Sequence, residues 1–167
     1  MSLLKLPLMI ALLLLVSGCA VQDRPALERP PLTLAAPPTA IIEGTCDDRA
    51  VLDNWLQAIS FRQEEFLSLM QTTPGKTREE IYADVEAMAA LRDLVNTEPV
   101  PDCGVEAQQA LSEIMSRILV YFQAYVNGEP IDLAQVVNES LPDYTAAQAL
   151  LDEPLARLNQ LYGLPTP

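Results

Sequence analysis

Three long stretches of the sequence carry apolar residues at intervals of three and four positions, and this spacing constrains the fold more than any other feature. It predicts amphipathic helices over about residues 48–72, 77–96 and 104–126. No stretch alternates at period two, so we expect no sheet. The side chains expected in the core are Leu52, Trp55, Leu56, Ile59, Phe66, Leu69, Met70, Ile81, Val85, Met88, Leu91, Val95, Leu111, Ile114, Met115, Ile118, Phe122 and Tyr125.

Capping and breaking residues delimit these helices. Asp47 or Asp48 can cap the first helix, and Pro74-Gly75 ends it. Thr77 and Glu80 have the spacing of a capping box, in which each side chain can bond the other's backbone N–H. The segment 97–102 contains two prolines and is expected to be a loop, and Asn127-Gly128 predicts a left-handed cap after the third helix.

The C-terminal part is less regular. Pro130 can open a short helix to Ser140, and Leu141-Pro142-Asp143 is expected to interrupt it. A last helix over residues 144–162 contains Pro154, which should kink or split it. The chain is therefore predicted to be all-α: a four-helix up-down bundle with a broken fourth element over residues 46–163, followed by a tail at 164–167.

Two cysteines test this topology. Cys46 directly precedes the first helix and Cys103 the third, and an up-down bundle starts both helices at the same end. The sequence thus predicts a Cys46–Cys103 disulfide, with two unpaired buried thiols as the alternative. The Pro101-Asp102-Cys103 segment before a long helix is similar to small exported bacterial helical proteins of uncharacterised function, and this similarity implies no activity.

The N-terminus has the pattern of an export signal. Lys5 is followed by an apolar run over residues 6–16, which is too short to span a bilayer and has the length of a signal-peptide core. The run ends in Val16-Ser17-Gly18-Cys19, which resembles the lipobox of bacterial lipoproteins. The resemblance implies that residues 1–18 are removed, that Cys19 is acylated, and that the chain is lipid-anchored outside the cytoplasm in a bacterial cell envelope.

Two other interpretations of this N-terminus stay open. One is an ordinary secretory signal cut after Ala20, and the other is an uncleaved anchor, which the short apolar run disfavours. Residues 19–45 contain five prolines without helical periodicity, namely Pro25, Pro30, Pro31, Pro37 and Pro38. We expect a disordered, extended tether there, lipidated at Cys19.

Composition excludes several functions. With 10 basic against 23 acidic residues and a net charge of −13, the chain should be repelled by nucleic acids. It contains no histidine, so histidine-based triads and His-rich zinc sites are ruled out. Carboxylates are numerous, but none follows a calcium-loop pattern. We expect these side chains to cap helices or to lie on solvent-exposed helix faces. Gly75-Lys76-Thr77 lacks the earlier glycine and the strand of a phosphate-binding loop.

No catalytic set, cofactor site or metal site emerges from these residues. The expected function is a non-enzymatic lipoprotein whose acidic bundle contacts an envelope protein or has a structural role in the envelope. The alternative is a binding module for a small apolar ligand held between helices, where small or flexible side chains could leave room. Those side chains are Ala83, Ala87, Met88, Ala89, Ala90 and Met115.

Overall fold

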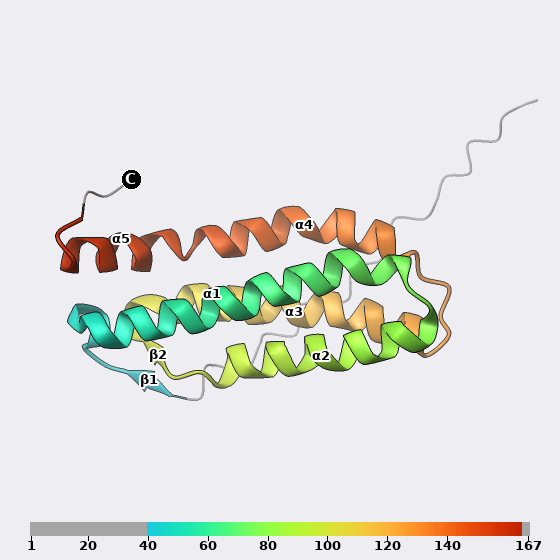
Figure 1. The fold of residues 1–167 in the computed structure, drawn as a ribbon, viewed down its shortest axis with the longest axis horizontal. Helices are drawn as coiled ribbons and strands as arrows, with labels where there is room; N and C mark the ends of the chain where they lie inside the picture. The colour runs from blue at the N-terminus through green and yellow to red at the C-terminus, as the bar shows by residue number, and fades with distance from the viewer. Residues whose placement is uncertain (1–39, 165–167) are drawn as a thin grey trace, which may run out of the picture.

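The computed structural model describes residues 40–164, which form a bundle of antiparallel helices (Figure 1). The helices are α1 (Arg49–Thr72), α2 (Arg78–Thr97), α3 (Val105–Val126), α4 (Leu133–Ala149) and α5 (Asp152–Leu161). α2 packs against α1 and α3, α4 packs along α3, and α5 continues the direction of α4 and lies against the start of α1. The up-down bundle with a broken fourth element is therefore confirmed. The predicted signal peptide, Cys19 and the prolines of the tether lie outside the described residues.

The predicted apolar stripes form one continuous core. Every expected inward residue of α2 is buried, as are most of those of α1 and α3. Leu69 and Tyr125 are half-buried at the edge of the core, and Tyr121 is buried in addition to the expected set. Leu133, Val136, Val137, Tyr144 and Ala147 of α4 complete the core from the fourth side.

The local signals at the helix ends are also confirmed. Asp48, rather than Asp47, caps α1: its carboxylate accepts hydrogen bonds from the N–H groups of Ala50 and Val51. Thr77 and Glu80 form the complete capping box at the start of α2. A single 3₁₀ turn, η2 (Thr73–Gly75), separates α1 from α2. After α3 the chain turns at Gly128, whose φ of 100° favours glycine.

The expectation of no sheet is wrong at one place. Strand β1 (Ile41–Ile42) pairs in parallel with β2 (Val100–Pro101), and the Val100 N–H donates to the Ala40 carbonyl over 3.0 Å. A pair of two-residue strands is too short to leave an alternating pattern in the sequence. It also brings residues 41–45, which the sequence analysis assigned to the tether, against the folded bundle.

Of the two interruptions expected in the fourth element, the one at residues 141–143 is absent, and the split of the last helix falls just before Pro154. Pro142 lies inside α4, which continues without interruption from Leu133 to Ala149. A proline has no N–H, so Pro142 cannot donate the helical hydrogen bond to the carbonyl of Asn138. Because Asn138 is exposed, water can donate to this carbonyl instead. The break falls instead at Leu150 and Leu151. Pro154 lies just after it, in the first turn of α5, where no intrahelical N–H bond is lost.

Candidate functional site at the disulfide-linked end

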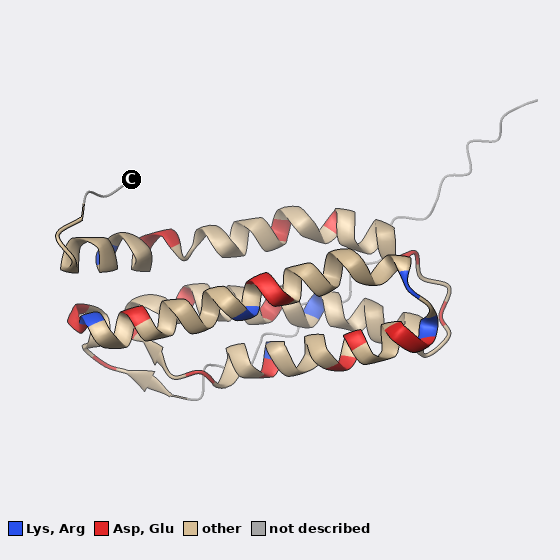
Figure 2. Cartoon of the chain, viewed as in Figure 1, with Lys and Arg blue, Asp and Glu red and all other residues tan. Residues whose placement is uncertain are grey.

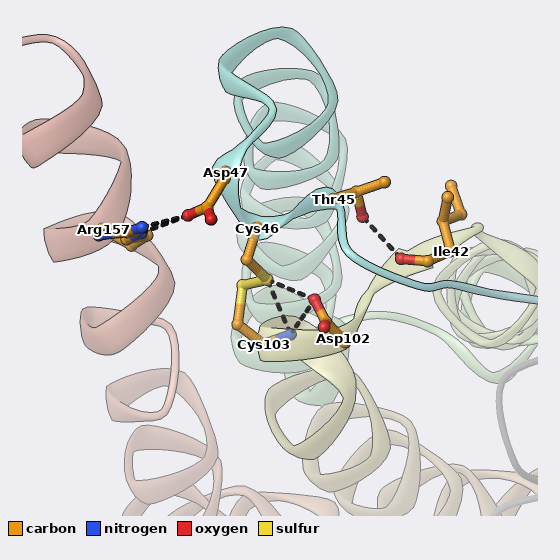
Figure 3. Close-up of a disulfide and its surroundings, with 7 residues drawn as sticks. All are labelled: Ile42, Thr45, Cys46, Asp47, Asp102, Cys103 and Arg157. Atoms are coloured by element: carbon orange, nitrogen blue, oxygen red, sulfur yellow. Dashed lines mark hydrogen bonds and ion pairs between the residues drawn. A yellow bond between two sulfur atoms is a disulfide. The ribbon is translucent and has the colours of Figure 1, made fainter.

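The disulfide predicted from the topology is present. Cys46 lies in the 3₁₀ turn η1 (Thr45–Asp47) before α1, and Cys103 lies in η3 (Asp102–Gly104) before α3 (Figure 3). Their sulfurs are bonded, and their Cα atoms are 6.0 Å apart. Because α1 and α3 start at the same end of the bundle, two residues 57 positions apart in the sequence meet there.

A carboxylate lies directly beside this disulfide. One oxygen of Asp102, Oδ1, is 2.8 Å from Sγ of Cys46 and accepts a hydrogen bond from the Cys103 N–H over 3.2 Å (Figure 3). The same N–H lies 2.9 Å from the Cys46 sulfur. Cys46, Asp102 and Cys103 are the single group of three potential metal ligands among residues 40–164. Since the two sulfurs are bonded to each other, the group offers no thiolate, and one carboxylate does not make a metal site.

Trp55 fills the space beneath the disulfide-linked turns. Its side chain is 2% exposed, and its Nε1–H donates to Oε1 of Gln108 over 2.8 Å. The Gln108 amide in turn donates to the backbone carbonyl of Glu98 over 2.9 Å. The indole ring lies so close to Gly104 that a Cβ there would be 2.5 Å from it. Sequence analysis missed this contact, because two residues on different helices leave no common pattern in the sequence.

Helix α5 contacts the disulfide-linked end of the bundle through polar groups. Arg157 pairs with Asp47, and the Tyr162 hydroxyl donates to Oδ2 of Asp53 over 2.8 Å. The guanidinium carbon of Arg49 lies 4.7 Å from the centre of the Tyr162 ring. The Tyr162 hydrogen bond lowers the pKa of Asp53 and raises the pKa of Tyr162, because it stabilises the charged carboxylate and the neutral phenol.

Other acidic residues lie at the ends of helices and along them (Figure 2). Asp84 accepts from Thr73 and pairs with Lys76 over 2.7 Å at the turn between α1 and α2. Glu80 completes the capping box, and the Thr77 hydrogen bonds lower its pKa. The pairs Glu64-Glu65 and Asp152-Glu153 are exposed. These groups do not converge on one pocket where two carboxylates could act as acid and base.

The buried tyrosine of α4, Tyr144, has a packing role. Tyr144 is fully buried, its ring stacks on Phe66 at 6.0 Å, and its hydroxyl donates to the Gln63 carbonyl over 2.6 Å. Burial raises the pKa of this tyrosine well above its usual range, so it is neutral. The interaction joins α4 to α1 across the core.

The small side chains considered for an apolar ligand do not surround a common space. Ala83, Ala87 and Ala90 of α2 are exposed, whereas Met88 and Met115 are fully buried in the core. The surface grooves include one of about 290 Å³ between α2 and α3 and one of about 340 Å³ between α3 and α4. Of the six side chains considered, Ala89 lines the first groove and none lines the second.

Comparisons with protein-family models, curated proteins and solved structures found no match. Among residues 40–164, no helix has the length and apolar character needed to cross a bilayer.

Proposed function

We propose that this chain is a bacterial lipoprotein, anchored through acyl groups on Cys19, whose bundle acts outside the cytoplasm as a non-enzymatic interaction or structural module of the cell envelope. The observation that supports the location is the Cys46–Cys103 disulfide. Disulfides persist in oxidising compartments, and an exported chain reaches one. The Val16-Ser17-Gly18-Cys19 pattern supplies the anchor in this proposal.

Charge supports a contact with protein rather than with nucleic acid or an anionic membrane surface. The net charge is −13, and carboxylates are spread along several helices of the bundle (Figure 2). Such a surface attracts basic partner surfaces and is repelled by phosphates. An interaction module of this kind would bind its partner less tightly at high ionic strength, because salt screens exposed charges.

The anchor is tested by expressing the full chain and its Cys19→Ser variant in a bacterium that processes lipoproteins. The expected result is that the unsubstituted chain loses residues 1–18, gains the mass of acyl chains and fractionates with membranes, whereas Cys19→Ser gains no lipid and is released from membranes. The matched control is Cys46→Ser, which should keep the lipid. A Cys19→Ser chain with unchanged mass and unchanged membrane retention would refute the anchor.

The interaction role is tested by crosslinking in intact cells at low and high salt. A partner with a basic surface should crosslink to the wild-type chain and do so less at high salt. Recovery of no specific partner under either condition would count against the proposed role and would leave the anchor result unaffected.

A further inference from the structure

The helix that follows the Leu150–Leu151 break, α5, is attached to the bundle through a partly covered apolar face and exposed polar contacts. Its apolar residues lie at helical spacing on one face: Leu151, Pro154, Leu155, Leu158, Leu161 and Tyr162. Leu151, Pro154 and Leu158 are buried, whereas Leu155 and Tyr162 are each 44% exposed and Leu161 is half-buried. The apolar face of α5 is thus incompletely covered by the bundle.

The ends of α5 add little to its attachment. No side chain caps its first turn, and its ten residues are too few to form a stable helix without packing. The Arg157–Asp47 pair is exposed, with 43% and 73% of the two side chains accessible, so its contribution is small. The hydrogen bond between Tyr162 and Asp53 is exposed as well. Turn residues at 150 and 151 separate α5 from α4, so α5 can move without unwinding α4.

This weakly attached helix packs on the disulfide-linked turns. α5 contacts both η1, which carries Cys46, and η3, which carries Cys103. Figure 3 shows α5 beside the disulfide, with Arg157 directed at Asp47, the neighbour of Cys46. Asp102 lies next to the Cys46 sulfur, 2.8 Å away, and its charge repels an incoming thiolate there.

We propose that α5 is a strap that opens about Leu150 and Leu151, and that its closed position limits the access of thiol reductants to the Cys46–Cys103 disulfide, whose two cysteines are half-buried with α5 in place. When the strap is open, a thiolate of a dithiol attacks one sulfur, the S–S bond breaks, and the other cysteine leaves as a thiolate that takes a proton. The second thiol of the reductant then attacks the mixed disulfide, closes a ring and releases the remaining cysteine. The rate of reduction therefore rises with the fraction of molecules in which the strap is open. This proposal does not depend on the proposed function.

The test compares two matched leucine variants in the full chain carrying Cys19→Ser, so that Cys46 and Cys103 are the only cysteines. Leu158→Ala removes a buried side chain from α5, and Leu133→Ala removes an equally buried one from the opposite end of the bundle (7% and 5% exposed). The protein is incubated with dithiothreitol, samples are alkylated at intervals, and the intact mass of each sample is measured by mass spectrometry. We expect Leu158→Ala to speed reduction at least about tenfold more than Leu133→Ala, because only the first change weakens the strap.

Two outcomes would overturn the proposal. Equal acceleration by both variants would mean that reduction follows unfolding of the whole bundle, and no acceleration by either would mean that the disulfide is already accessible. Hydrogen exchange of the unsubstituted chain gives a second measurement in case Leu158→Ala does not fold. The amides of α5 should exchange faster than those of α4, and equal protection of the two helices would also refute a strap.

Discussion

Gly104 has the most severe steric restriction among the described glycines, and replacing it with alanine should destabilise the bundle strongly. An added Cβ would lie 2.5 Å from Cη2 and 2.6 Å from Cζ2 of Trp55, where ordinary contacts are 3.4–4 Å. The ring would have to retreat by about 1 Å. It cannot do so freely, because it is 2% exposed and its Nε1–H is bonded to Gln108.

The magnitude follows from these two restraints. Overpacking a well-filled core costs about 1–3 kcal/mol, and a buried hydrogen bond weakened by the shift costs about 1 kcal/mol more. We expect Gly104→Ala to reduce the free energy of unfolding by about 2–4 kcal/mol, which is a large fraction of the roughly 5–15 kcal/mol typical of a domain.

The assay is urea unfolding of Gly104→Ala against two references. Gly75→Ala is the matched control, because no atom lies within 4 Å of the position of its new Cβ and its φ is negative; it should change stability by no more than about 1 kcal/mol. The second reference is a double-mutant cycle with Trp55→Phe, which shortens the ring. The double variant should lose less free energy of unfolding than the sum of the losses of the two single variants. A Gly104→Ala loss below about 0.5 kcal/mol, or strict additivity with Trp55→Phe, would refute the reasoning.

Three further predictions rest on other contacts. Cys46→Ser and Cys103→Ser should each lower stability by about 4 kcal/mol in thermal unfolding, and the double variant should be little worse, because each change removes the same crosslink. Tyr144→Phe keeps the ring but removes the hydroxyl that donates to the Gln63 carbonyl, so urea unfolding should show a free energy of unfolding lower by about 1–3 kcal/mol. An unchanged midpoint would contradict this hydrogen bond. Thr77→Ala should cost about 1 kcal/mol at pH 7. The Thr77 N–H and, to a smaller extent, the Thr77 hydroxyl donate to the Glu80 carboxylate and lower the pKa of Glu80 in the folded state. The stabilisation that comes from the ionised carboxylate is present above the unfolded carboxyl pKa of about 4.3 and is lost as the pH falls through the folded pKa. Thr77→Ala removes the hydroxyl and keeps the N–H, so pH-dependent unfolding should show a somewhat smaller acid loss of stability in the variant, and a larger acid loss would refute the linkage.

The candidate site was predicted in part. The pairing of Cys46 with Cys103 followed from the order of the helices, because two helices that start at one end bring their preceding residues together. The position of Asp102 at the Cys46 sulfur and the docking of Arg157 on Asp47 could not be predicted. Exposed charged residues occur throughout this acidic sequence, and no local pattern says which of them will meet.

The sequence by itself determined the elements whose causes are local. Apolar residues three and four apart define a helical face wherever the helix later packs, and Thr77 and Glu80 form their capping box within one turn. Tertiary structure decided the features that need two distant segments. Pro142 is accommodated within α4 at a position where Asn138, the residue whose carbonyl loses its helical partner, is exposed. The helix breaks eight residues later, before the segment that packs on α1. The β1–β2 pair and the contact of Gly104 with Trp55 likewise depend on the position of another helix, and spacing along one segment carries no information about that position.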